Sequence, residues 1–511
     1  MMYSHPRQPC RIAAGSPLFT CAAICLTLLV ASSPVRAQPP AAQLPAAEPS
    51  GLQAALAIEQ VLIDTIARTE KSIVAIATVR SGDERGAAPG FRADPFDRFR
   101  QDLRATQPSD PDFVPSEYGT GVVIDPRGLI LTMYHVVEQG DRHWVTTAAR
   151  KSYPAKIRAA DPRSGLAVLE IEASDLEPIT FGDASKLRKG QIVIALGNPY
   201  AIARDGQVSA SWGIIANLAR KAAPVPSSER AERKPTLHHF GTLIQTDAKL
   251  NFGTSGGALI NLHGEMVGLT TSIAATAGYA AAAGYAVPID ATFLRVIDTL
   301  KEGREVEYGL LGVEPVNLLP EEIRAGRQGL RVGEVWAGTP AGQIGLERGD
   351  VITHVNEVRV FDADSLVLEV GKLPAASEVE LRLLRDSQPQ KFEVTLAKYP
   401  VRGEGVVTNR PAAWRGMRVD YPTSLPAEEY QMHARTGDIH LEGCVVITEV
   451  EKESLAWKAG LRQKMFVVEL DNQRIHNPAD FQAAAEAAAG PMRVRLTLPD
   501  DQQPWRTIRA E

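Results

Sequence analysis

The sequence predicts a mainly β protein that consists of one large β domain followed by two copies of a smaller β-rich domain. Between residues 118 and 288, short apolar runs rich in Val, Ile and Thr are separated by Gly and Pro, as in GTGVVID, LILTMYHVV, GLAVLEIE and QIVIALGNP. Many short strands with turn signals and no intervening helices indicate an all-β barrel or sandwich. The two smaller domains are predicted from an internal repeat nearer the C-terminus.

The repeat has one constant offset of 115 residues. TPAGQIGLERGDVITHVNEVRV at 339–360 aligns with SLAWKAGLRQKMFVVELDNQRI at 454–475, so that Gly345 falls on Gly460 and Asn356 falls on Asp471. A single offset that holds over this length indicates two copies of a domain of roughly 100 residues.

The bulk composition is that of a soluble protein with several domains. A chain of 511 residues with 44% hydrophobic and 23% charged residues has room for more than one core. The formal net charge is −6 and no block of basic residues occurs, so we expect no nucleic acid partner. We also expect no metal and no cofactor.

The N-terminus has the pattern of a cleaved export signal. Arg7 and Arg11 lie in a polar start, the apolar run LFTCAAICLTLLVA follows, and VRA ends at Ala37. A retained membrane anchor is the weaker alternative, because the run is shorter than the ~20 residues that span a bilayer. We therefore expect a signal peptide at 1–37, a Pro/Ala-rich leader at 38–54, and a soluble protein of the periplasm or cell envelope.

Cleavage after Ala37 would also remove three of the four cysteines, namely Cys10, Cys21 and Cys25. The remaining thiol, Cys444, has no partner for an internal disulfide. It lies in the apolar run GCVVITEV, where we expect a buried small apolar residue.

The large domain begins and ends with predicted helices. LAIEQVLIDTIARTEKS predicts a helix, IVAIATV predicts a strand, and the Pro-, Asp- and Arg-rich residues 81–117 predict a long loop. At the other end, DATFLRVIDTLKEG predicts a closing helix with Asp290 as its cap.

The stretch NFGTSGGALINLHG, residues 251–264, places Ser255 between glycines at the start of an apolar run. GTSGG fits the G-x-S-x-G pattern of α/β-hydrolases, but that elbow requires a helix after the serine. Here two predicted strands joined at His263–Gly264 follow, which excludes that fold. Taken alone, Ser255 in a plain tight turn remains the simpler interpretation.

A nucleophilic serine needs a base, a group that orients the base, and donors for the oxyanion. His135 lies 120 residues upstream, at the end of LILTMYHVV, in the histidine-before-serine order of β-barrel proteases. A glycine-rich turn can aim the N–H groups of Gly253 and Ser255 into one cavity. A lone histidine is by default a core residue, so His135 also keeps a purely structural interpretation.

Together these motifs resemble the HtrA/Deg family, which are exported, trypsin-like serine proteases with C-terminal PDZ domains. YGTGVVIDPRGLILTMYHVV, FGDASKLRKGQIVIALGNP, LIQTDAKLNFGTSGGALIN and GYAVPID occur in the order of that family. The resemblance implies a trypsin-like double β-barrel at 55–303, a PDZ domain at 304–399, a linker at 400–410 and a second PDZ domain at 411–511.

The resemblance also implies roles for particular residues. His135 would be the general base, Ser255 the nucleophile, and Gly253 and Ser255 the oxyanion donors. Unfolded or damaged envelope proteins would be the substrates, exposed protein C-termini would be ligands, and the protein would form trimers.

The sequence departs from the family at the third catalytic position. Family members carry an aspartate where this chain has Gly165, within DPRSGLAVL. A glycine cannot accept the Nδ1–H of His135, and neither Ser164 nor Asp161 is an obvious substitute. Two functions therefore stay open: a serine endopeptidase weakened by the missing acid, and a catalytically silent peptide-binding chaperone or adaptor.

In PDZ domains, a loop of backbone N–H groups binds the C-terminal carboxylate of a peptide. By the resemblance, the first such loop is LLGV and the second is WRGM. Their residues are Leu310, Leu311, Gly312 and Val313 in the first copy, and Trp414, Arg415, Gly416 and Met417 in the second. The second copy has RQKM where the first has RGD, so peptide binding by the second loop is doubtful.

Overall fold

The computed structural model describes residues 51–510, apart from 80–116, 139, 199–206, 223–235, 251–252, 272–282, 402, 441, 488–489 and 498–503. The predicted signal peptide, almost all of the leader and nearly all of the long loop at 81–117 lie outside these residues. The chain divides into two units, Met1–Ala55 and Leu56–Glu511, and the domains described below belong to the second.

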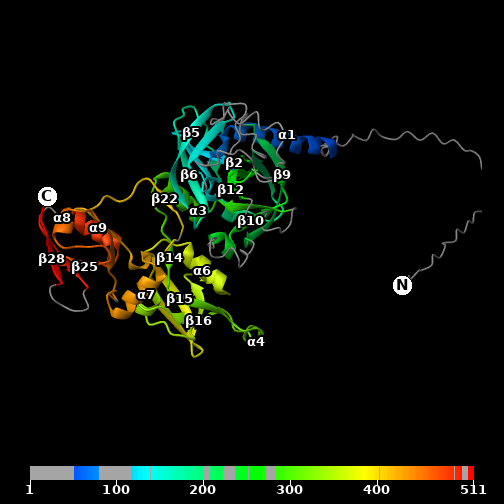
Figure 1. The fold of residues 1–511 in the computed structure, drawn as a ribbon. Coiled ribbons are helices and arrows are strands. Elements are labelled where there is room, and N and C mark those ends of the chain that lie inside the picture. Colours follow the sequence, from blue (N-terminus) through cyan, green and yellow to red (C-terminus); the bar gives the residue numbers. More distant parts are fainter. Residues whose placement is uncertain are drawn as a thin grey trace, which may run out of the picture. The chain divides into compact units, whose positions relative to one another are not determined.

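The first half of the large domain is a closed β-barrel (Figure 1). Its six strands pair in the order β5-β4-β1-β2-β3-β6, and β5 also pairs with β6, which closes the ring. The strands are β1 (Ile73–Val79), β2 (Glu117–Asp125), β3 (Leu129–Met133), β4 (Arg142–Thr147), β5 (Ser152–Asp161) and β6 (Leu166–Ile171). Closure leaves few strand edges exposed.

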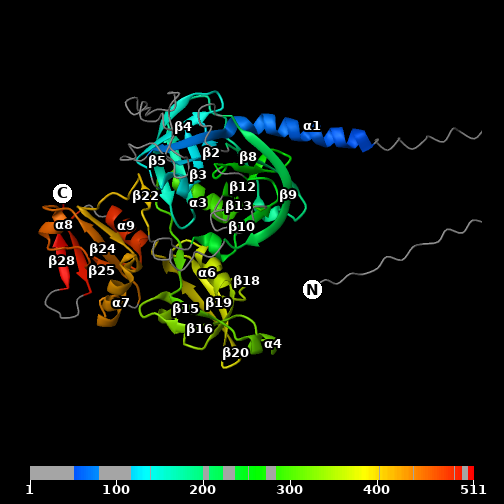
Figure 2. The same cartoon turned by 45° about the vertical axis from the view of Figure 1, so that its right-hand side comes forward.

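The second half is another closed barrel, with strand order β11-β8-β9-β10-β13-β12 and a closing β11–β12 pair. The strands are β7 (Thr180–Phe181), which pairs with β12 at the margin, β8 (Ile192–Gly197), β9 (Ser209–Arg220), β10 (Leu243–Thr246), β11 (Ala258–Ile260), β12 (Glu265–Thr271) and β13 (Gly284–Pro288). Figure 2 shows β8, β9, β10, β12 and β13 in the green part of this domain. The double barrel predicted by the resemblance is therefore confirmed.

In the described part of this domain the α-helices are α1 (Gly51–Thr69), which begins in the first unit, α2 (Tyr134–Val137) and α3 (Ala291–Lys301). Asp290 caps α3 as expected, because its Oδ1 accepts the N–H of Phe293 at 3.0 Å. The pattern LILTMYHVV is not one strand, however. Strand β3 ends at Met133, and a single helical turn carries His135.

The first smaller domain is a five-strand path, β15-β16-β17-β19-β20, with β18 paired to β17 and a separate β14–β21 pair. Its elements are β14 (Gly309–Leu310), β15 (Val313–Asn317), α4 (Pro320–Arg324), β16 (Leu330–Val335), α5 (Pro340–Gln343), β17 (Val351–Val355), β18 (Val358–Arg359), α6 (Ala363–Gly371), β19 (Glu378–Arg385), β20 (Gln388–Thr395) and β21 (Ala397–Lys398).

The second smaller domain repeats that path as β23-β24-β25-β27-β28, with β26 paired to β25. Its elements are β23 (Met417–Asp420), α7 (Ala427–Thr436), β24 (Val445–Val450), α8 (Leu455–Lys458), β25 (Phe466–Leu470), β26 (Gln473–Arg474), α9 (Pro478–Glu486), β27 (Met492–Leu496) and β28 (Trp505–Ile508). The short strand β22 (Val406–Val407) lies in the predicted linker and pairs with β5 of the first barrel.

The offset of 115 residues holds in the structure, because β17 and β25 are related by it, as are α5 and α8. Asn356 and Asp471 occupy the same turn with φ of 52° and 50°. Asn and Asp are among the few side chains that adopt such angles readily. Cys444 is buried and free, as predicted. No helix within the described ranges is long and apolar enough to cross a membrane.

Candidate active site and peptide-binding loops

Ser255 lies in a loop between the two barrels and is 4% exposed. Gly253 and Gly256 have φ of 90° and 85°, a region that favours glycine. A Cβ atom on Gly256 would overlap the carbonyl oxygen of Thr120. Glycine is therefore required at position 256 by the close approach of the first barrel, and it is favoured at position 253 by the backbone angle.

The N–H groups that follow Ser255 are used within the fold. Gly256 N–H donates to the Thr270 carbonyl at 2.8 Å, and Gly257 N–H donates to the Thr254 carbonyl at 3.0 Å. Neither can also bind an oxyanion. The two donors that the sequence assigns to this role belong to Gly253 and Ser255, and this assignment stays a prediction.

His135 lies on the single turn α2, and the backbone on both sides of it is fixed. Tyr134 N–H donates to the Gly165 carbonyl at 2.7 Å. The Thr78 hydroxyl donates to the Val136 carbonyl at 3.0 Å. The chain therefore places the backbone of Gly165 next to the helical turn that carries His135.

The turn of His135 and the loop of Ser255 meet at Gly119. A Cβ atom on Gly119 would lie 2.7 Å from Cγ2 of Val136 and 3.1 Å from the carbonyl oxygen of Ser255. Glycine at this position is thus what allows the two segments to approach. The segments that carry the predicted base, nucleophile and vacant acid position are brought together at the junction of the barrels.

The acid position itself is a tight turn. Gly165 has φ of 70°, and its N–H donates to the Asp161 carbonyl at 3.0 Å. The Asp161 carboxylate accepts the Ser164 N–H at 2.8 Å and the hydroxyl of the buried Tyr308. Burial raises the pKa of Asp161. The carboxylate of Asp161 is therefore occupied within its own turn, and the Ser164 hydroxyl contacts the same turn.

His238, which the sequence analysis did not single out, lies beside this vacancy. A Cβ atom on Gly165 would lie 3.5 Å from Nε2 of His238. That nitrogen donates to the Ser164 carbonyl at 2.7 Å, and Nδ1 accepts from the Thr242 hydroxyl at 2.8 Å. Burial lowers the pKa of His238 to about 4, so the ring is neutral at neutral pH. The only sequence signal was the histidine pair in TLHHF.

The two ends of the first predicted peptide-binding loop pair with other strands, Leu310 with Ala397 of β21 and Val313 with Val335 of β16. Leu311 is buried, and Gly312 has φ of 90°. The loop connects two separate strand pairs and does not fold back on itself.

The second loop is closed. Trp414 N–H donates to the Met417 carbonyl, and Met417 N–H donates to the Trp414 carbonyl, both at 2.9 Å. Arg415 and Gly416 have φ of 48° and 83°, which is typical of a type I′ turn. The N–H group of Met417, one of the expected carboxylate donors, is therefore already committed.

Arg415 occupies the position of the buried Leu311 and is itself 8% exposed. Its guanidinium donates to the carbonyls of Ile508, Arg509 and Gly490, and it lies 4.7 Å from the centre of the Trp414 ring. A buried charge needs such partners. The bonds to the carbonyls of Ile508 and Arg509 also hold the closed loop against the C-terminal strand β28.

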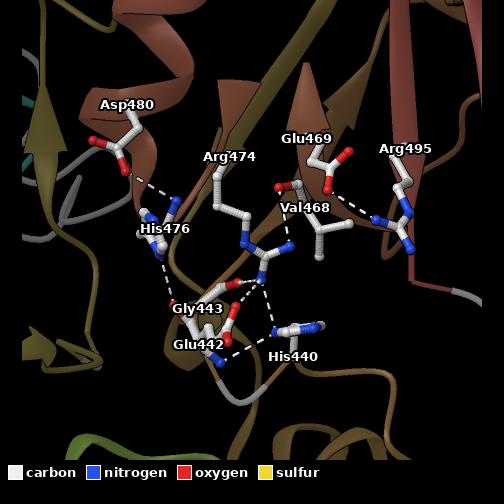
Figure 3. A network of polar contacts seen from close by, with 9 residues as sticks. All are labelled: His440, Glu442, Gly443, Val468, Glu469, Arg474, His476, Asp480 and Arg495. Atoms are coloured by element: carbon white, nitrogen blue, oxygen red, sulfur yellow. Dashed lines mark hydrogen bonds and ion pairs between the residues drawn. The ribbon is translucent and has the colours of Figure 1, made fainter. Parts of the chain in front are cut away.

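A polar network supports the turn before β24 in the second domain (Figure 3). Nδ1 of His440 accepts Nη2–H of Arg474 at 2.7 Å and the Glu442 N–H at 3.1 Å. Arg474 also donates to the carbonyls of Gly443 and Val468. Since Nδ1 accepts both bonds, His440 is neutral here, and burial together with Arg474 lowers its pKa.

Two family models match the chain. A model described as the trypsin-like peptidase domain matches residues 119–269, and one described as the PDZ domain matches residues 309–396. A protein of Marinomonas sp. named "Probable periplasmic serine endoprotease DegP-like" is 30% identical over 431 residues, which cover 82% of this chain and 86% of that protein. The chain belongs to the HtrA/DegP-like serine endoproteases.

Other relatives that carry the same name support this family membership. The protein of Brucella suis is 30% identical over 81% of this chain and 78% of its own length, and that of Ectopseudomonas mendocina is 32% identical over 72% and 74%. A solved structure titled "HtrA-type protease AlgW with tripeptide" shares the fold at 24% identity, with a TM-score of 0.50 over 66% of this chain and 97% of that one. This HtrA-type chain is accordingly a serine-type endopeptidase by family.

Proposed function

We propose that this HtrA-type endopeptidase cleaves unfolded or damaged envelope proteins by acyl transfer through Ser255, at a rate reduced by the missing acid. The observation that supports it most is the junction at Gly119, where the turn of His135 meets the loop of Ser255. This proximity of the two segments supports the proposal, although Gly165 stands at the predicted acid position.

In this proposal the Ser255 hydroxyl attacks the scissile carbonyl while His135 takes its proton. The N–H groups of Gly253 and Ser255 stabilise the oxyanion, and His135 then protonates the leaving amine. Water hydrolyses the acyl-enzyme by the same route in reverse. Without an acid, the tautomer of His135 is not fixed and its charged form is not stabilised, which in known triads costs about 10⁴-fold in kcat.

The test introduces the missing carboxylate at position 165. Gly165→Asp should raise kcat by about 10²–10⁴-fold, because the new carboxylate would orient His135. The φ of 70° at Gly165 is unfavourable for most side chains, but Asp and Asn tolerate it best. Gly165→Asn is therefore the matched control, since it imposes the same backbone strain without the charge. It should give no comparable gain.

The labelling of Ser255 separates the two functions that the sequence left open. A fluorophosphonate should label the wild-type protein slowly, Gly165→Asp faster, and Ser255→Ala not at all. A folded protein that is labelled in none of these forms would instead be a peptide-binding chaperone or adaptor. The glycine at position 165 is the observation that favours this second function.

We further propose that peptide C-termini bind to the first PDZ domain at Leu310–Val313 and not to the second at Trp414–Met417. The pairing of the first loop with other strands and the closed turn of the second support this difference. Amidation of a peptide's C-terminus should abolish its binding, because the loop recognises the carboxylate. Equal affinity for the amidated peptide would refute the proposal.

We also propose that the protein is exported and cleaved after Ala37, as relatives that are named periplasmic suggest. The resemblance to the HtrA/Deg family further leads us to propose a trimer. N-terminal sequencing of the mature protein should begin at Gln38, and analytical ultracentrifugation should give three times the mass of one chain. An intact Met1 in a membrane fraction would contradict the first part, and a monomer would contradict the second.

A further inference from the structure

Thr120 of β2 bonds to the Ser255 loop through both its backbone and its side chain. It is completely buried. Its backbone N–H donates to the Ser255 carbonyl at 2.8 Å. Its hydroxyl donates to the Gly253 carbonyl at 2.8 Å. One side chain and its own backbone thus hold both residues to which the sequence assigns the oxyanion donors.

The same hydroxyl also accepts a hydrogen bond. Asn198 N–H donates to Oγ1 of Thr120 at 2.9 Å. A threonine hydroxyl has one hydrogen to donate, and here it goes to the Gly253 carbonyl, because a carbonyl can only accept. The hydroxyl therefore links the end of β8 to the oxyanion loop with a defined direction for both bonds.

Thr120 is itself fixed from the other side. The Thr132 hydroxyl on β3 donates to the Thr120 carbonyl at 2.7 Å. Gly256 packs against that same carbonyl, where no side chain would fit. Since Thr120 is held by β3 and by the loop, it cannot move independently of either, and its bonds to Gly253 and Ser255 have a rigid base.

We propose that Thr120 is a positioning residue for the oxyanion hole, which holds Gly253 and Ser255 so that their N–H groups converge on one point. These two carbonyls belong to the peptide units 253–254 and 255–256, which lie on either side of the unit that carries the Ser255 N–H, and the first of them directly follows the N–H of Gly253. The bonds from Thr120 therefore restrict how these two N–H groups can turn. Such donors stabilise a transition state only if they are placed before the reaction begins. The proposal rests on the function proposed for Ser255.

The side-chain hydroxyl can be tested separately from the packing of the residue. Thr120→Val keeps the shape but leaves both Asn198 N–H and the Gly253 carbonyl without their partner, whereas Thr120→Ser keeps the hydroxyl. Thr246 of β10 is a matched control. It is also fully buried, and its hydroxyl likewise donates to a carbonyl, that of Ile214, at 2.8 Å and accepts a backbone N–H, that of Ala248, at 3.1 Å.

Thr120→Val should lower kcat and the rate of fluorophosphonate labelling by about 10–100-fold, while KM should change less than about twofold. This loss is smaller than the loss that removal of an oxyanion donor itself causes. Thr120→Ser should retain most of both rates. Thr246→Val should lose comparable thermal stability but keep the reactivity of Ser255. Equal reactivity of Thr120→Val and Thr246→Val, or a loss that Thr120→Ser shares, would overturn the proposal.

Hydrogen exchange distinguishes a failure of this proposal from a failure of the proposed function. Thr120→Val should increase amide exchange in residues 253–257 of the free protein, and Thr246→Val should not. If wild-type Ser255 is never labelled, the proposed protease function fails, and unchanged exchange in Thr120→Val would overturn the positioning role as well. If labelling is normal in Thr120→Val, only the positioning role fails.

Discussion

The two PDZ copies have the same backbone path, yet their predicted carboxylate loops differ. Leu310 and Val313 pair with Ala397 and Val335 of other strands, whereas Trp414 pairs with Met417 of its own loop. The loops are anchored identically. Trp336 N–H donates to the Gly312 carbonyl at 2.9 Å, and at the equivalent position Glu451 N–H donates to the Gly416 carbonyl at 2.7 Å. What differs is the reciprocal pairing of Trp414 with Met417 in the second copy. If these loops bind the peptide carboxylate through backbone N–H groups as we propose, the shared fold does not imply a shared ligand, because the N–H of Met417 is already bonded.

The largest effect that would test this comparison comes from the paired glycines of the two loops. A Cβ atom at Gly312 would overlap Thr339, one at Gly416 would overlap Ser454, and both glycines have positive φ. Gly312→Ala and Gly416→Ala should each destabilise their own domain by roughly 2–5 kcal/mol. Only Gly312→Ala should abolish binding of a C-terminal peptide in fluorescence anisotropy.

The control for that experiment is the binding measurement on Gly416→Ala in the full chain. An unchanged peptide affinity is expected. If Gly416→Ala also removes binding, the second loop is competent and the difference between the copies is wrong.

A second prediction concerns the buried guanidinium of the closed loop. Arg415→Leu should destabilise the second domain by about 2–4 kcal/mol, because three backbone carbonyls lose a charged donor. Urea unfolding followed by hydrogen exchange of β24 and β25 measures this. The substitution copies Leu311 of the first domain but should not create peptide binding, because the Trp414–Met417 pair remains. A gain of binding would show that Arg415 alone closes the loop.

A smaller effect on stability is expected from substitution of Cys444. The equivalent residue of the first copy, 115 positions earlier, is Gly329. Burial raises the pKa of the Cys444 thiol to about 11, so little thiolate forms at neutral pH. The native protein should react with a thiol reagent at least about 100-fold more slowly than the protein in urea. Cys444→Ala should cost on the order of 1 kcal/mol in urea unfolding. Rapid labelling of the native protein would contradict the burial.

The smallest expected effect is a pH dependence of the stability of the second domain, which arises from His440. The first domain has Ala325 at the equivalent position, 115 residues earlier, and should lack this contribution. The pKa of His440 is lowered in the folded protein, so the unfolded chain binds the proton more readily. Stability that is present at pH 7 should therefore be lost as the pH falls below about 6.5. The loss should be under ~1 kcal/mol, because the ring is partly exposed and screened.

His440→Gln is the comparison for this measurement. Between pH 7 and pH 5 the urea midpoint of His440→Gln should fall less than that of the wild type, because the titrating group is absent. An identical pH dependence in both proteins would assign the effect to other groups.

Much of the fold could be predicted because periodicity and turn residues are local properties of the chain. Strands such as β1, β2, β6 and β8, the cap at Asp290 and the repeat offset all followed from patterns of this kind. The helical turn at Tyr134–Val137 could not be predicted, since YHVV has strand propensity and is helical only because Tyr134 N–H and the Val136 carbonyl find partners on other elements.

The candidate site was predictable only in part. The positions of His135, Ser255 and Gly165 along the chain were readable, because motifs flank each of them. His238 and Thr120 were not, since nothing in their own sequence surroundings indicates that one faces the vacant acid position and the other bonds to Gly253. Both act through contacts with residues more than seventy positions away.

By itself, the sequence determined the β architecture, the repeat, the order of histidine and serine, and the absence of a carboxylate at position 165, because each is a matter of residue type and spacing. Only the tertiary structure decided that Asp161 is engaged by its own turn and by Tyr308, that the Thr120 hydroxyl bonds to the Gly253 carbonyl, and that Trp414 pairs with Met417. These are hydrogen bonds between segments or across a turn, and a hydrogen bond depends on the direction of its groups, which spacing along the chain does not specify.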